Sequence, residues 1–153
     1  MGWTALHHAC DCSSWSTHAY NAALDLAQVT PVKLMNKGTE GTQPAGYTCL
    51  HFACDGSDKG FKRKDIVEKL LDNKAELEAR DAKGNTPLLT AAGTGVSDLV
   101  KLLIDRRADV NAVNARGLGA LQRAANHSSE VWGILNKAGA IKTQVAGTWT
   151  NNG

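Results

Sequence analysis

Apolar residues recur at helical spacing along the chain, in pairs of short segments. In the clearest example, positions i, i+3 and i+4 hold Leu88, Ala91 and Ala92. This spacing places the three side chains on one face of a helix. Thr86 can cap that helix through its hydroxyl group. Pro87 suits its first position, where a backbone N–H is not needed.

A second helix is predicted directly after this one. Gly93 and Gly95 are expected to end the first helix. Ser97 is expected to cap the second helix, which ends near Asp105. Apolar residues cover more of the second helix than is usual at a surface, so we expect it to pack between neighbours. Residues 108–117 then predict a β-hairpin with its turn at Asn114–Gly117.

Four segments of the chain share one frame of residues. Each begins with glycine, and the four are Gly2–Ala9, Gly46–Ala53, Gly84–Ala91 and Gly117–Ala124. Their leading glycines are 44, 38 and 33 residues apart. A second frame is shared by residues 67–79 and 100–112. Such self-similarity indicates stacked repeats, each of which buries its apolar face against its neighbours.

A period near 33 with a Gly-x-Thr-Pro-Leu-His-x-Ala frame resembles the ankyrin repeat. The resemblance covers nearly the whole chain and is strongest over residues 46–125. It implies an all-α solenoid of stacked helix-turn-helix repeats joined by short β-hairpins. We expect a repeat domain over residues 1–140 and a polar tail or cap over 141–153. The expected repeats are 2–45, 46–83, 84–116 and 117–140.

Three departures from the frame are informative. The second repeat has surplus residues at 55–64, which we expect between its two helices. The first repeat is longer still, with the surplus expected within 11–29. Residues 18–28 are periodic there, and 30–35 can form a further short turn. The last repeat lacks Thr and Pro at the start of its first helix, as expected of a terminal unit.

Composition and charge restrict the class of protein. The chain has 153 residues, a formal charge of +2 and 42% hydrophobic residues, which suits one folded domain. No apolar run approaches the roughly 18 residues of a membrane span, and the N-terminus does not resemble a signal peptide. We therefore expect a cytoplasmic protein without a membrane role, although a nuclear location stays open. A monomer is favoured.

The resemblance implies a non-enzymatic module that binds a protein partner. Partners of the family bind a concave groove formed by hairpin tips and first helices. By position, the groove candidates are Trp3, Tyr47, Asp55, Arg80, Lys83, Asn85, Thr94, Arg116, Leu118 and His127. Trp, Tyr and Arg often dominate binding energies. Alternatively, the rings of Trp3 and Tyr47 pack against the preceding repeat or the local insertion. A third reading makes the chain a structural spacer within a larger protein.

Catalysis is not indicated by any motif. The chain lacks a glycine-rich phosphate loop and a nucleophile elbow, and Cys54 lies three residues after His51, a spacing that also suits helix packing. We expect no cofactor. The resemblance implies that His7 and His51 bond backbone or hydroxyl groups of adjacent repeats.

The cysteines offer a different function. A metal-binding or redox module would use Cys10, Cys12, Cys49 and Cys54, together with His7 or His51. However, the spacings are C-x-C and C-x4-C, and not the paired C-x2-C of strong zinc motifs. We expect free thiols that pack as small apolar groups, and no metal.

Two further features concern partners and modification. A basic run at 59–64 is the strongest signal for nucleic acid or an acidic partner, but flanking aspartates reduce its charge. We expect it to be a solvated loop and consider nucleic acid unlikely. The resemblance also marks Asn111 as a candidate for β-hydroxylation, since Leu103 lies eight residues before it and Asp109-Val110 precede it. Alternatively, Asn111 only braces its hairpin.

Overall fold

The computed structural model describes residues 4–10, 17–40, 45–55, 63–124 and 128–142. The described residues form the helices α1 (Ala5–Cys10), α2 (Thr17–Val29), α3 (Val32–Met35), α4 (Cys49–Cys54), α5 (Arg63–Asp72), α6 (Pro87–Thr94), α7 (Ser97–Asp105), α8 (Ala120–Ala124) and α9 (Ser129–Lys137). Within these ranges the extended pairing is limited to one antiparallel bridge between Val113 and Gly119. The predicted all-α class is therefore confirmed. No helix of the described ranges has the length and apolar character to cross a membrane.

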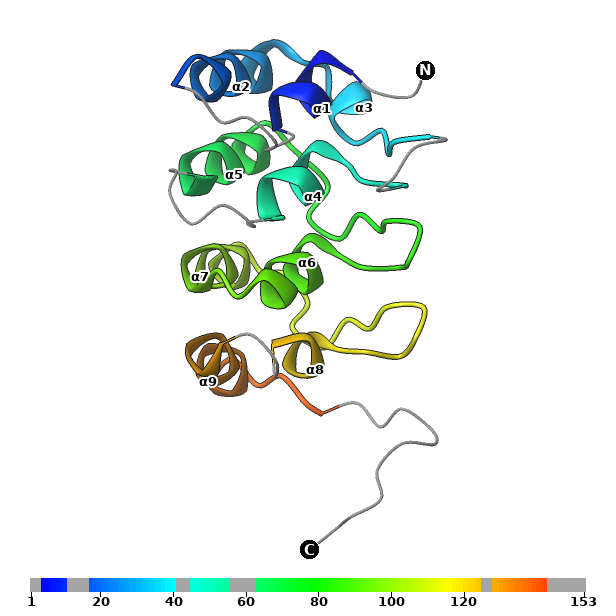
Figure 1. Cartoon of the computed structure of the whole chain (residues 1–153), viewed down its shortest axis with the longest axis vertical. Helices are drawn as coiled ribbons and strands as arrows, with labels where there is room; N and C mark the ends of the chain where they lie inside the picture. Colours follow the sequence, from blue (N-terminus) through cyan, green and yellow to red (C-terminus); the bar gives the residue numbers. More distant parts are fainter. Residues whose placement is uncertain (1–3, 11–16, 41–44, 56–62, 125–127, 143–153) are drawn as a thin grey trace, which may run out of the picture.

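The helices stack in two parallel rows. Figure 1 shows α1, α4, α6 and α8 in one row and α2, α5, α7 and α9 in the other. Each helix contacts the next helix of its own row and the partner of its own pair. The loops that join successive pairs project from the side of the first row, away from the second. This arrangement is the predicted solenoid.

Local sequence explains most of the helix ends. The Thr86 hydroxyl accepts a hydrogen bond from the Leu89 N–H at 3.3 Å, and Pro87 is the first residue of α6. Gly95 ends α6 in the left-handed conformation with φ of 78°. However, Gly93 lies inside α6, so the prediction that it ends the helix is wrong.

The predicted cap at Ser97 is also wrong. Val96 takes the capping position of α7 in an extended conformation, and its side chain offers no acceptor. Ser97 is instead the first helical residue. By contrast, α9 has a serine cap, since the Ser128 hydroxyl accepts from the Val131 N–H at 3.3 Å.

The two long repeats differ from the shortest one partly as expected. α2 forms the second helix of the first repeat, and the short α3 follows it and lies beside α1 in Figure 1. The surplus predicted at 55–64 between the helices of the second repeat is placed there only in part, because Arg63 and Lys64 already belong to α5. α8 has only five residues, consistent with the missing Thr-Pro start.

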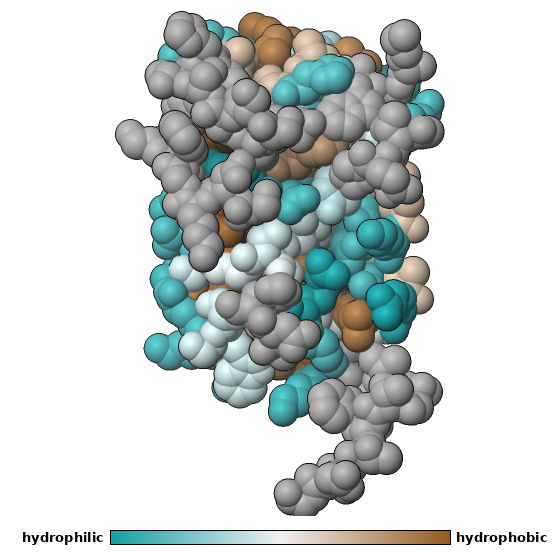
Figure 2. Space-filling model, viewed as in Figure 1, coloured by the Kyte–Doolittle hydropathy of each residue, from teal (hydrophilic) through white to brown (hydrophobic). Residues whose placement is uncertain are grey.

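A continuous apolar core lies between the two rows. The frame leucines of the first helices are each at most 3% exposed, and they are Leu6, Leu50, Leu88 and Leu121. The second row contributes buried residues that include Ile66, Leu70, Leu99, Leu103, Val131 and Leu135. Burying each such side chain contributes about 1.5–3 kcal/mol. At the N-terminal end of the stack, Val29, Val32 and Leu34 remain exposed, and hydrophobic surface is visible there in Figure 2.

Candidate functional site

The hairpin loops at 79–86 and 112–119 are joined into a row by backbone hydrogen bonds. The Ala82 N–H donates to the Ala45 carbonyl at 3.1 Å, and the Ala115 N–H donates to the Lys83 carbonyl at 3.0 Å. Each loop is closed by a turn whose last residue is glycine: Gly84 donates to Asp81 and Gly117 to Asn114, both at 2.9 Å. The predicted turn at Asn114–Gly117 is confirmed, although the strands beside it are too short for more than one bridge.

Two glycines make the close approach of these loops possible. Gly46 and Gly84 both have positive φ, at 75° and 74°. A Cβ atom on Gly46 would lie 2.6 Å from the Ala82 nitrogen, and one on Gly84 would lie 2.7 Å from the Ala115 nitrogen. Conformation and space therefore both require glycine at these positions.

Polar side chains fix the interior of the loops. The Asp81 carboxylate accepts hydrogen bonds from the N–H groups of Lys83 and Asn85, at 2.8 and 2.7 Å, and from the Asn85 side-chain amide at 2.8 Å. The Asn114 side-chain amide donates to the Asn85 side-chain oxygen at 2.9 Å. Asn85 is only 4% exposed. It therefore supports the loops, and its prediction as a partner-binding residue is corrected.

Two histidines bond backbone and hydroxyl groups. The expected bond to an adjacent repeat is present for His51, whereas His7 reaches the loop that follows α3 in its own repeat. His7 Nε2 lies 2.8 Å from the Lys37 carbonyl oxygen, and His51 Nε2 lies 2.9 Å from that of Asn85. Since a carbonyl only accepts, Nε2 carries the proton, and Nδ1 accepts from the hydroxyl of Thr4 or Thr48 at 2.8 or 2.9 Å. Burial lowers the pKa of both imidazoles, which favours these neutral rings.

Tyr47 lies at the start of α4 and is half-buried. Its ring stacks on His51 at 5.3 Å between centroids and meets Phe52 edge-on at 5.2 Å. Burial, with the nearby charges of Asp55 and Asp81, raises the pKa of its phenol to about 12. The ring therefore packs on side chains of its own repeat, rather than on the preceding repeat or the insertion as the alternative expected, and part of it is open to a partner.

Three predicted cations lie on the hairpin loops and are exposed. Lys83 and Arg116 occupy equivalent turn positions, and their side chains contact no partner within the described ranges. Arg80 lies between the loops, where Nη1 is 3.0 Å from the Gly84 carbonyl oxygen and 2.6 Å from that of Val113.

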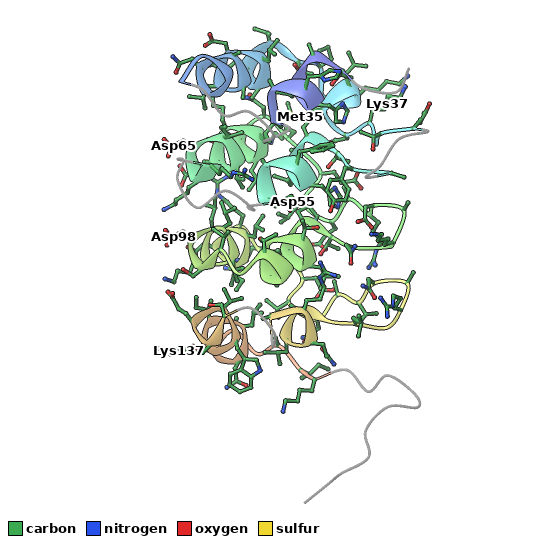
Figure 3. All side chains as sticks on the ribbon, in the orientation of Figure 1. Met35, Lys37, Asp55, Asp65, Asp98 and Lys137 are labelled. Carbon is green, nitrogen blue, oxygen red and sulfur yellow. The ribbon has the colours of Figure 1, made fainter. Side chains whose placement is uncertain are left out.

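The remaining predicted residues are more scattered. Leu118 is half-buried, and its N–H donates to the Asn114 side-chain oxygen at 3.0 Å. The Thr94 hydroxyl donates to the Ala91 carbonyl at 3.1 Å. Asp55 follows the end of α4, and Figure 3 shows it between Lys37 on the loop side and Asp98 on the outer side of α7. Trp3 and His127 lie outside the described residues.

Arg123 was not predicted, and it extends across two helix pairs. Its Nε donates to the Leu89 carbonyl at 2.7 Å, and its guanidinium lies against Gly93. A Cβ atom on Gly93 would be 2.4 Å from Nη2. The signal in the sequence is a glycine inside one helix followed, one repeat later, by a long cationic side chain.

The basic run has a different role from the one expected. Arg63 begins α5 and is buried at 3% exposure, and its guanidinium donates to the Asp55 carbonyl oxygen. Lys64 pairs with Glu68 at 3.9 Å. The prediction of a solvated loop is therefore wrong for Arg63. Residues 59–62 lie outside the described residues.

The cysteines do not assemble a site in the described ranges. Cys10, Cys49 and Cys54 are buried free thiols, and burial raises the pKa of Cys49 to about 12 and also raises the pKa of Cys54. No group of three or more potential ligands there could hold a metal ion. Cys12 lies outside the described residues. The metal-binding or redox alternative thus gains no support.

Asn111 belongs to a series of side chains that join successive repeats. In each case a side-chain oxygen accepts a backbone N–H about 30–40 residues further along the chain, in the next repeat or, for Ile141, directly after the last one. These pairs are Asn36 with Glu76 at 2.8 Å, Glu78 with Asp109 at 2.9 Å, and Asn111 with Ile141 at 2.9 Å. Asn111 is therefore a brace, and it is exposed. Its hydroxylation stays a prediction.

Comparison with known families agrees with this geometry. A family described as "Ankyrin repeats (3 copies)" matches residues 50–145. The match includes α5 to α9 and most of α4. It covers more than half of the chain, and the stacked helix pairs and linked hairpin loops fit it. The chain therefore belongs to the ankyrin repeat family.

Proposed function

We propose that this chain binds a protein partner along its hairpin face. This face consists of the exposed parts of the hairpin loops and of the first helices beside them: Tyr47, Arg80, Lys83, Thr94, Arg116, Leu118 and Arg123. Ankyrin repeats are in general protein-interaction modules, and this property supports binding rather than catalysis.

One observation carries the proposal, namely the row of backbone hydrogen bonds between successive loops. These bonds, from Ala82 to Ala45 and from Ala115 to Lys83, hold the turns in fixed relative positions. The side chains at the turns start from an ordered backbone, so less conformational entropy is lost when a partner binds. A pre-organised surface of this kind suits recognition of another protein.

Affinity capture with the isolated chain, followed by mass spectrometry, would identify a partner. Amide hydrogen exchange of the complex would then locate the surface. We expect slower exchange at residues 79–86 and 112–119 in the complex than in the free chain. Protection confined to α5, α7 and α9 would overturn the proposal, because those helices form the opposite side of the stack (Figure 1).

A further inference from the structure

Charge is distributed unevenly between the two sides of the stack. The segments 79–96 and 112–124, which hold the loops and the first helices α6 and α8, contain four cationic residues and one carboxylate. The four cations are Arg80, Lys83, Arg116 and Arg123. The segments 63–78 and 97–111, which hold α5 and α7, contain seven cationic and eight acidic residues. The excess of positive charge therefore belongs to the hairpin face.

This excess is only partly offset within the described residues. Asp81 is buried at 7% exposure, and its carboxylate oxygens already accept hydrogen bonds inside its loop. Glu78 lies near enough to Arg80 for the two charges to interact, so Arg80 is partly compensated. Lys83, Arg116 and Arg123 form no ion pair with a carboxylate within the described ranges. In contrast, three cations of the second row form ion pairs: Lys64 with Glu68 at 3.9 Å, Lys101 with Glu130 at 3.2 Å and Arg106 with Asp72 at 2.9 Å.

Arg123 is the most specific of the four cations. Its Nε–H is held by the Leu89 carbonyl at 2.7 Å, and the absence of a side chain on Gly93 leaves room for its guanidinium. Its terminal amino groups have no acceptor within the described ranges. A guanidinium has a planar set of N–H groups that can bind a carboxylate in a bidentate manner. Arg123 is half-buried, and its orientation is fixed by the bond to Leu89.

We propose that the partner segment on the hairpin face is acidic and extended. One carboxylate binds the terminal amino groups of Arg123, and others lie beside Lys83 and Arg116. An extended chain fits because these cations come from successive repeats whose loops are joined in a row. This inference rests on the proposed function and specifies the chemistry of the partner.

A protein segment is favoured over nucleic acid. The segments 79–96 and 112–124, which carry the four cations, contain no aromatic residue on which bases stack. Tyr47 is the aromatic residue named in the hairpin face, and its ring is half-buried against His51 and Phe52. Four cations spread over two repeats are also fewer than the dense Lys/Arg patch of a nucleic-acid surface. Nucleic acid is therefore the alternative that the experiment must separate.

The full chain can be titrated with a labelled peptide of ten glutamates at about 50 mM salt, where exposed charges are weakly screened. We expect binding, and no binding of a peptide of ten glutamines. Lys83→Glu with Arg116→Glu should weaken the binding by about tenfold or more, because attraction becomes repulsion. The control Lys69→Glu with Lys137→Glu makes the same change of net charge on α5 and α9 and should have a much smaller effect.

The role of Arg123 is tested by nuclear magnetic resonance of the 15N-labelled chain. Its Nε–H signal should shift when the glutamate peptide is added, and Arg123→Lys should weaken binding although the charge is kept. Thermal unfolding of Arg123→Lys would show whether the stack persists. If the Nε–H signal stays fixed while the signals of Lys83 and Arg116 move, Arg123 only joins the repeats.

Other results would overturn the inference as a whole. These are no binding of the glutamate peptide, equal weakening by the control pair, or tighter binding of a single-stranded oligothymidine. If a captured partner protects residues 79–86 and 112–119 while the glutamate peptide does not bind, the acidic character is wrong and the proposed function stands. Protection of the opposite side would defeat the proposed function itself.

Discussion

His7 and His51 each join a first helix to a following loop through a neutral imidazole. The ring of each histidine is buried and donates Nε2–H to a backbone carbonyl, that of Lys37 in the loop after α3 for His7 and that of Asn85 in the following repeat for His51. A proton added at Nδ1 would break the bond accepted from the threonine at the helix start. The charge of the imidazolium would also be buried, and this is the main cause of the lowered pKa values.

Stability should therefore depend on pH in a defined direction. Because the folded pKa lies below the ordinary value of 6.5, the unfolded chain takes up protons first as the pH falls. The free energy of unfolding should be level above about pH 7 and should decrease between pH 6.5 and 5.5. Urea denaturation at several pH values measures this.

A matched pair of variants assigns the pH dependence. His51→Leu, which places at this position the residue type found at Leu89 in the next repeat, should reduce the slope. His8→Gln changes an exposed histidine of α1 and should keep it. Equal slopes in both variants would show that the buried imidazoles are not the cause.

The thiols should react slowly in the native protein. The thiolate is the reactive form, and burial raises the pKa of Cys49 and of Cys54. We expect slow reaction of Cys10, Cys49 and Cys54 with a disulfide reagent, and four titratable thiols after unfolding without reductant. Fewer than four thiols would indicate a disulfide or a bound metal.

The residue types allowed some of these roles to be predicted and not others. His7 and His51 occupy the histidine position of the ankyrin repeat frame, so their hydrogen bonds to backbone and hydroxyl groups could be predicted from that position. The position of Asn85 in the repeat frame predicted a surface residue. Its side-chain amide instead donates to the Asp81 carboxylate and accepts from the Asn114 amide, and it is buried in the loop. The role of Arg123 was not predicted because its guanidinium fills space that is free only since Gly93 has no side chain.

At the scale of elements, the helices were largely predictable and their exact ends were not. The spacing of apolar residues and the Thr-Pro start gave α6 and α7 and their pairing. Gly93 is helical because α6 runs to Thr94. The left-handed conformation that ends the helix is adopted by Gly95 and not by Gly93. Val96, and not Ser97, is the extended residue that precedes the first helical residue of α7. Residue types alone do not predict which residue takes this backbone conformation.

The hairpin loops offer a direct test of how elements are joined. Gly84→Ala and Gly117→Ala both place alanine at positive φ, which costs about 1–2 kcal/mol. Gly84→Ala should cost more, since its Cβ would lie 2.7 Å from the Ala115 nitrogen and disrupt the bond to the next loop. That lost bond adds about 1 kcal/mol.

Chemical denaturation of the two glycine variants measures the difference. For Gly117 no described atom lies within 4 Å of the added Cβ, so this variant is the control for backbone strain alone. If both variants lose the same free energy of unfolding, contact between the loops does not contribute to stability.

At the scale of the whole molecule, the stack has two unlike sides. Asp65, Asp98 and Lys137 lie on the outer side of the second helix row in Figure 3, where acidic and basic residues nearly balance. The loop side carries an excess of cations that are held on an ordered backbone. The repeat frame predicted a loop side that binds a partner. It did not predict that Asp81 is buried inside its loop, and this burial leaves the exposed cations Lys83 and Arg116 without a carboxylate partner within the described ranges.

Binding of a captured partner to two charge-reversed forms of the chain tests the central claim most directly. Lys83→Glu with Arg116→Glu alters the hairpin face, and Lys69→Glu with Lys137→Glu alters the second helix row by the same net charge. We predict a dissociation constant raised about tenfold or more for the first pair and by less than about twofold for the second. Unchanged binding of the first pair, or greater loss in the second, would contradict the assignment of the hairpin face.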